Sequence, residues 1–191
     1  MKPIYVRHVH EALDRLLPEA LPGYVHWPLK LEKEERRQAT LFPGSRLYGR
    51  SSPSGAVFLH FIPHRRQEDL IAEVGWSTSG RFPVALSSRV PKARPEDEFL
   101  EQDWLIDFGE LFHRRYGRGH VGWEVWSCSV GIEHPDFQKI FVQEDLASVT
   151  EEEARARADR AITTCLKDIQ DVAVPYLNRW LEGQRGKQGA G

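Results

Sequence analysis

The sequence contains little cysteine and no long hydrophobic run. Its two cysteines, Cys128 and Cys165, stand 37 positions apart in a chain of 191 residues, which excludes both a CxxC redox motif and the disulfide framework of a small secreted domain. We therefore expect both to be small buried hydrophobic residues in a reducing compartment. No apolar segment approaches the roughly 20 residues that span a bilayer, and the N-terminus lacks the basic and apolar regions of a signal peptide. The expected location is the cytoplasm, with no membrane partner.

Complete catalytic motifs are also missing. The chain has no GxSxG, SxxK or HExxH sequence, and the spacing of its eight histidines predicts no metal site. The segment Gly117–Gly122 has the spacing G-x-G-x-x-G, but a strand-like aromatic segment follows it where a phosphate site needs the start of a helix. We expect no cofactor, no bound metal and no catalytic residue.

Charge of either sign is not in excess overall, because the net charge is -2. Its distribution is uneven: residues 46–95 carry eight basic and three acidic residues, 96–110 carry seven acidic residues and no basic one, and 121–153 carry eight acidic residues against one basic. Such polarity predicts one positive and one negative face that recognise another macromolecule. The plainer alternative is an ordinary solvated surface.

Hydrophobic periodicity gives the secondary structure. Apolar residues at spacings of three and four predict a helix over residues 4–21, and an irregular connection with prolines at 28 and 43 follows to Gly44. Three strands are expected over 46–50, 56–62 and 70–77. Apolar residues at both alternating sets of positions in 56–62 indicate a strand that is covered on both faces, and alternation in 70–77 puts Glu73 opposite Trp76.

Periodicity and composition also predict the elements in the second half of the chain. We expect an extended segment near 82–86 and then a surface loop to Pro95, a helical turn near Phe99, a strand near 104–108, a short helix beyond it and a last strand over 123–128. Residues 99–116 also fit a helical pattern in part. Thr150 followed by Glu153 is a capping box that begins a long amphipathic helix, and Pro175 is expected to start a separate final helix.

These elements predict an α+β fold: an antiparallel sheet of about five strands with the N- and C-terminal helices packed on one face. The length and the 40% of apolar residues are consistent with one domain over residues 1–183, and residues 184–191 are expected to form a flexible tail. The sequence leaves the oligomeric state open.

Trp126 is the centre of the candidate binding surface. Alternation along the strand sends Trp123 and Trp126 to opposite faces, so one ring is expected to be exposed, and arginines precede it closely. Aromatic and arginine side chains dominate protein interfaces and also stack on bases. The candidate binding residues are Trp126, Arg114, Arg115, Arg118, Arg81 and Glu73. The leading hypothesis is a non-enzymatic protein with a protein partner, and the bland alternative is a tryptophan covered by a loop or helix.

Two other functions are weighed beside it. A metal-dependent nuclease or hydrolase would be centred on Glu73 and nearby histidines, but Gly75 stands where the expected lysine would be. Direct nucleic-acid binding would use the arginines at positions 65, 66, 81, 89 and 94 and would weaken steeply with salt.

A resemblance adds to this reading. The segments 73–77, Gly80-Arg81-Phe82-Pro83, Gly122-Trp123 and Pro175-Tyr176-Leu177 resemble those of small bacterial proteins classed as domains of unknown function, over about residues 45–181. The resemblance implies a compact α+β domain with no assigned activity, of a kind associated with genes of bacterial conflict. The leading hypothesis of a binding protein therefore includes an immunity or defence-accessory factor. The resemblance carries over no functional residue.

Overall fold

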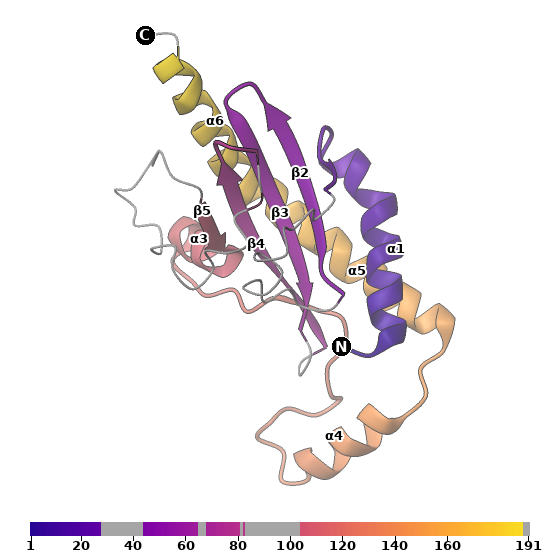
Figure 1. The fold of residues 1–191 in the computed structure, drawn as a ribbon. Coiled ribbons are helices and arrows are strands. Elements are labelled where there is room, and N and C mark those ends of the chain that lie inside the picture. The colour runs from indigo at the N-terminus through magenta and orange to yellow at the C-terminus, as the bar shows by residue number, and fades with distance from the viewer. Residues whose placement is uncertain (28–43, 65–67, 81, 83–103, 189–191) are drawn as a thin grey trace, which may run out of the picture.

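The sheet and its helices are seen in a computed structural model, which describes residues 1–27, 44–64, 68–80, 82 and 104–188. Figure 1 shows the elements. In chain order they are α1 (Pro3–Ala20), β1 (Val25–His26), β2 (Arg46–Ser52), β3 (Gly55–Pro63), β4 (Asp69–Ser77), β5 (Trp104–Asp107), α3 (Phe108–Tyr116), β6 (Trp123–Glu124), α4 (Phe137–Leu146), α5 (Glu151–Asp168), the π-helical turn η2 (Ile169–Ala173) and α6 (Val174–Gln188).

The strands form one antiparallel sheet in the order β1-β2-β3-β4-β5, and β6 pairs with the beginning of β4. The expected α+β class is therefore confirmed, and so are the strands that the sequence placed around residues 46–50, 56–62, 70–77 and 104–108. The short edge strand β1, which pairs Val25 with Gly49, was not anticipated.

Both faces of the central strand β3 are buried, as its apolar composition predicted. Val57, Leu59 and Phe61 belong to the main core, whereas Phe58 lies on the opposite face with Leu47 and Ala56. On that second face the ring of Phe58 has edge contacts with those of Trp27 and Phe82, at centroid distances of 5.4 and 5.5 Å. Apolar side chains therefore cover both faces of the sheet at β3.

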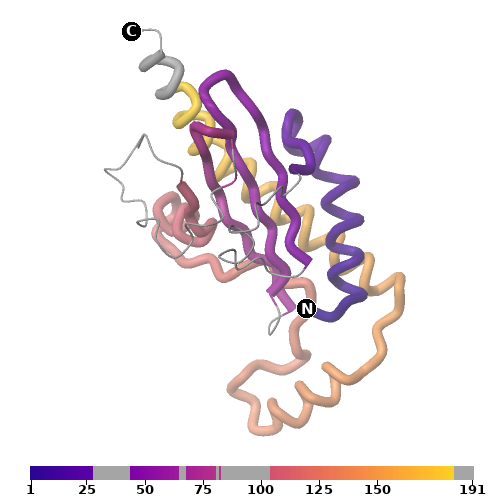
Figure 2. Tube along the Cα trace, viewed as in Figure 1, coloured from indigo at the N-terminus to yellow at the C-terminus, as the bar shows by residue number. Residues whose placement is uncertain are grey.

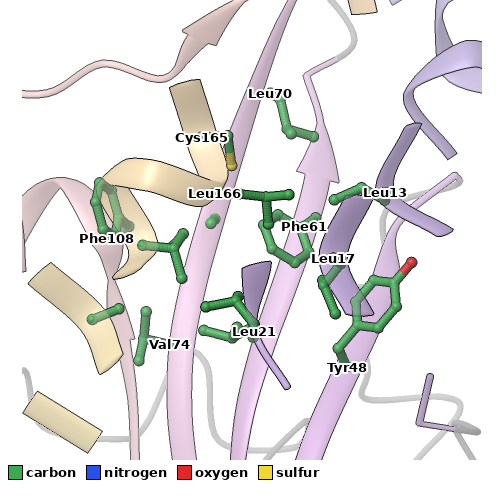
Figure 3. Close-up of a cluster of buried hydrophobic side chains, with 14 of the residues drawn as sticks. Leu13, Leu17, Leu21, Tyr48, Phe61, Leu70, Val74, Phe108, Cys165 and Leu166 are labelled. Atoms are coloured by element: carbon green, nitrogen blue, oxygen red, sulfur yellow. The ribbon is translucent and has the colours of Figure 1, made fainter. Parts of the chain in front are cut away.

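Helices α1 and α5 lie side by side on one face of the sheet and run in the same direction (Figure 1). Arg7 pairs with Glu151 near the start of both helices, and Arg15 pairs with Asp159 at 2.5 Å two turns further on. Between the helices and the sheet, Leu13 and Leu17 of α1 meet Phe61 of β3 in the core that Figure 3 shows.

The C-terminal helices begin at the predicted cap, because the Thr150 hydroxyl accepts a hydrogen bond from the Glu153 amide at 3.1 Å. We expected Pro175 to start a separate helix, but the chain stays helical through it. The five-residue π-turn η2 comes just before, so Pro175 is the second residue of α6 and lies directly after a change in the helical hydrogen-bond register. Trp180 of α6 then lies against Trp76, with centroids 5.5 Å apart.

The structure differs from the sequence-based expectations in the last strand and in helix α4, and some expected elements lie outside the described residues. The last strand was expected over 123–128 but contains two residues, because the amides of Val125 and Trp126 both donate to the Glu68 carbonyl and the chain leaves the ladder there. Helix α4 was not anticipated at all. The expected extended segment after Phe82, the loop to Pro95 and the turn near Phe99 fall in residues that the structure does not describe. In the parts described, none of the helices has the length and apolar character needed to cross a bilayer.

Candidate binding cleft

Gly122 and β6 bring Trp126 to the surface. Gly122 has φ 127°, and a Cβ atom at this position would lie 2.8 Å from the Leu70 carbonyl oxygen, so only glycine fits this approach to β4. The next residue, Trp123, is buried, and its indole N–H donates to Asp168 at 2.8 Å. Trp126, three residues on, is only partly buried. The expected burial of one of the two rings is therefore seen, but Trp126 is not fully exposed: its ring packs against the edge of the main core, and it lies beyond the end of β6 and not on a strand face.

The backbone around Trp126 is fixed by Glu68, which precedes β4. The Glu68 carbonyl accepts hydrogen bonds from the amides of Val125 and Trp126 at 2.8 and 3.1 Å. Its carboxylate accepts one from the Lys2 amide, with distances of 3.1 and 3.0 Å to the two oxygens. Glu68 thereby holds the Trp126 segment beside the beginning of α1.

Helix α4 forms the outer wall beside Trp126. The ring of Phe141 lies 5.8 Å from that of Trp126, and Phe137 lies 5.7 Å from Phe141. The loop before the helix is tied back to it, because both the amide (2.8 Å) and the hydroxyl of Ser129 donate to Glu144. These bonds hold the pKa of the Glu144 carboxyl below its usual range. Figure 2 shows that the chain carrying α4 extends beyond the end of the sheet, on the side where the N-terminus lies.

A cleft of about 850 Å³ lies between these segments; we call it the α4 cleft. It is lined by the aromatic rings of Trp126, Phe137 and Phe141, by the loop residues 127–131, and by charged groups from four segments. Those charged groups are the carboxylates of Glu68, Asp69, Glu124 and Asp145, the Lys2 side chain and the amino group of Met1.

One carboxylate of the cleft, that of Asp69, is partly removed from solvent. Burial raises the pKa of Asp69, although the neighbouring His64 opposes this shift. The Asp69 Oδ1 atom has no hydrogen-bond partner within the described residues, because the His64 ring nitrogen is 3.6 Å away. Lys2 Nζ lies 3.7 Å from Asp145 and 5.8 Å from the centre of the Trp126 ring. A cation thus already occupies part of this space.

Apolar side chains also surround the cleft on the outside. Helix α4 has no buried residue, and Val142 and Leu146 on it are 54% and 80% exposed. Val121, which itself lines the cleft, is 88% exposed, and Ile132, in the loop that leads to α4, is 77% exposed. An isolated ten-residue helix is only marginally stable in water, and this one has little core packing to support it.

The sequence-predicted binding residues are not all gathered at this place. Trp126 is in the cleft. Arg114 and Arg115 lie in the last turn of α3, where Arg114 pairs with Glu110, and Arg118 lies over the ring of Phe112 at 5.6 Å. The cation that the structure brings to Trp126 is Lys2. Arg81, Arg65, Arg66, Arg89 and Arg94 are outside the described residues.

Glu73 lies on the second face of the sheet, away from Trp76, as predicted. It pairs in register with His60 of β3, whose Nδ1 is 2.9 Å from the carboxylate. Asp107 lies opposite Glu73 on β5, but its carboxylate caps α3 by accepting the Gly109 amide at 2.7 Å. Across the described part of the chain, no three His, Cys, Asp or Glu side chains are grouped to hold a metal ion.

The two cysteines differ in burial. Cys165 is fully buried and its pKa is raised by that burial, as expected for a core thiol. The expectation was wrong for Cys128, which is only partly buried and lines the α4 cleft. The physical reason is that β6 ends at Glu124, so Cys128 belongs to the loop and not to a core strand.

Sequence reasoning missed Lys2, Phe141 and Asp145. The signal that was available is the acidic excess of residues 121–153, together with the apolar positions 137, 140, 141, 142 and 146 that recur there at helical spacings. The chain was compared with models of protein families, with curated proteins and with solved structures, and none of them matches it. The α4 cleft must therefore be interpreted from its own chemistry.

Proposed function

We propose that this chain is a non-enzymatic binding protein that recognises a partner protein through the α4 cleft and the apolar residues around it. The observation that carries this proposal is helix α4, a ten-residue helix with no buried residue and with large apolar side chains in solvent. Exposed apolar surface next to an aromatic cleft is typical of protein interaction sites, because association removes that surface from water.

The residues of the cleft fit recognition better than catalysis. Aromatic side chains are enriched in the buried centre of interfaces, and Trp126 with its neighbours Phe137 and Phe141 supplies such a centre. Nucleophilic catalysis by a thiol commonly uses a paired histidine, and no histidine lines the described part of the cleft that contains Cys128. The immunity or defence-accessory role stays a sequence-based prediction, and the proposal does not depend on it.

Photo-crosslinking in the cells that make the protein tests this function. A benzoylphenylalanine is introduced in place of Val142, on the exposed side of α4, and in a matched variant in place of Arg155, an exposed residue of α5. We expect a discrete crosslinked protein from position 142 that is missing from position 155. Adding Phe141→Ala should reduce that product several-fold while the circular dichroism spectrum is unchanged, because α4 has no buried residue.

If position 142 gives no crosslinked protein, or the same products as position 155, the exposed face of α4 has no specific partner.

A further inference from the structure

We infer that the α4 cleft takes a lysine or arginine side chain carried on an apolar segment of the partner protein. The inference rests on the proposed function and specifies the chemistry of the partner.

Lys2 shows how a cation fits between the walls of the cleft. Its ammonium lies 5.8 Å from the centre of the Trp126 ring and 3.7 Å from the Asp145 carboxylate, so an aromatic face and a carboxylate act on one charge. Cations are attracted to the negative face of an indole ring, and Trp is the best aromatic partner for them. A cationic group of the partner can use the same two walls, either beside Lys2 or in its place.

Negative charge in the cleft exceeds the positive charge that the chain supplies. Four carboxylates line it against Lys2 and the Met1 amino group, which donates to the His64 carbonyl at 2.7 Å. Glu124 is exposed, and its carboxylate makes no hydrogen bond or ion pair with any other described residue. Burial raises the pKa of Asp69, and the Glu124 carboxylate adds to this shift, whereas His64 and the Met1 amino group oppose it. A cationic partner complements this field, whereas a phosphate-bearing one is repelled.

The apolar rim distinguishes a protein segment from a small cation. Val142 and Leu146 are exposed on α4 outside the cleft lining, and a small ammonium ligand would leave them uncovered. A second copy of this chain fits less well. In a two-fold symmetric dimer the same patch lies on both sides, so the carboxylates at Asp145 and Glu124 would approach their own equivalents.

Peptide selection on the full-length chain tests the inference. A phage-displayed library of random 12-residue peptides is selected on the purified protein, and the enriched peptides are measured by fluorescence polarisation. We expect them to contain lysine or arginine next to leucine or aromatic residues. Asp145→Asn and Glu124→Gln should each weaken binding roughly threefold, which is the effect of one charge contact at a partly exposed site.

Two further variants sharpen the test. Glu19→Gln removes an exposed carboxylate at the far end of α1 and should leave the affinity unchanged. Lys2→Met removes the internal cation and should tighten binding by a similar factor, because the partner's cation no longer shares the Trp126 ring. Raising the salt concentration should weaken binding to the wild-type chain.

The outcomes separate this inference from the proposed function. If position 142 crosslinks a partner in cells but the selected peptides carry no excess of basic residues, or bind Asp145→Asn as well as the wild type, the cationic specificity is wrong and the binding function stands. If the crosslinked product is the chain itself, the occupant is a second copy and the inference is overturned. If neither selection nor crosslinking gives a product, both proposals fail.

Discussion

We predict that Leu13→Ala lowers the free energy of unfolding by about 3 to 4 kcal/mol. Leu13 of α1 is fully buried at 0% exposure, in the core between the helix and the sheet (Figure 3). Removing three carbon atoms there loses about 2.4 kcal/mol of transfer free energy, at ~0.8 kcal/mol for each methylene-sized group. The cavity left among rigid neighbours adds a further loss of about 1 kcal/mol.

Leu146→Ala is the matched control, because it is the same chemical change in another helix at a residue that is 80% exposed. It should change the free energy of unfolding by less than about 0.5 kcal/mol. If α4 contacts a partner as proposed, this variant should nevertheless reduce the crosslinked product from position 142 several-fold. We thus expect Leu13→Ala to lower stability and Leu146→Ala to lower binding without lowering stability.

Urea denaturation followed by tryptophan fluorescence and by circular dichroism measures both variants. For a chain of this length, the Leu13→Ala loss corresponds to a melting temperature roughly 6 to 16 °C lower. The urea slope should be unchanged, which shows that the same surface unfolds. A loss below about 1 kcal/mol for Leu13→Ala, or equal losses for the two variants, would refute the packing described here.

Three other predictions concern single polar groups. Thr150→Ala removes the acceptor for the Glu153 amide and should lower the free energy of unfolding by about 1 kcal/mol in urea denaturation, whereas Thr150→Ser keeps the cap and the stability. Ser129→Ala removes the hydroxyl donor to Glu144, so the pKa of that carboxyl should rise toward its ordinary value in an NMR titration; an unchanged pKa would show that the bond does not form in solution. The pKa of Asp69 is raised by burial, so the folded protein binds more protons than the unfolded chain in the range above pH 3.8 and loses stability as pH rises through it. Asp69→Asn should abolish this loss, so its stability relative to the wild type should increase between pH 4 and pH 7, and a constant difference would count against the shift.

Local patterns in the sequence were sufficient for most of the fold. The alternation that placed Glu73 opposite Trp76 is a property of any extended strand, and the cap at Thr150 depends only on residues three positions apart. The strands over 46–52, 55–63 and 69–77 were found for the same reason. Where the pattern was short or mixed it failed: β1 has two residues, and β6 has two where six were expected.

The candidate site, in contrast to the fold, depends on residues that are far apart in the sequence. Trp126 was identified from alternation, but its neighbours Lys2, Phe141 and Asp145 lie 124, 15 and 19 positions away along the chain. No local periodicity relates such positions. Lys2 is held near Trp126 because Glu68 binds the backbone of both segments, and α4 is held there by the hydrogen bonds between Ser129 and Glu144. Of the arginines close to Trp126 in sequence, Arg114 and Arg115 instead lie in α3, where Arg114 pairs within its own helix, and Arg118 lies over the ring of Phe112.

The sequence by itself determined the helices α1 and α5, the strands β2 to β5 and an acidic segment after residue 121, because these follow from composition and from spacings within a few residues. Only the tertiary structure decided that this segment holds an unburied helix, and that its aromatic wall meets a lysine from the other end of the chain. Contacts of that kind are fixed by the packing of the whole core and by the few hydrogen bonds that join distant backbones, which no stretch of sequence encodes alone.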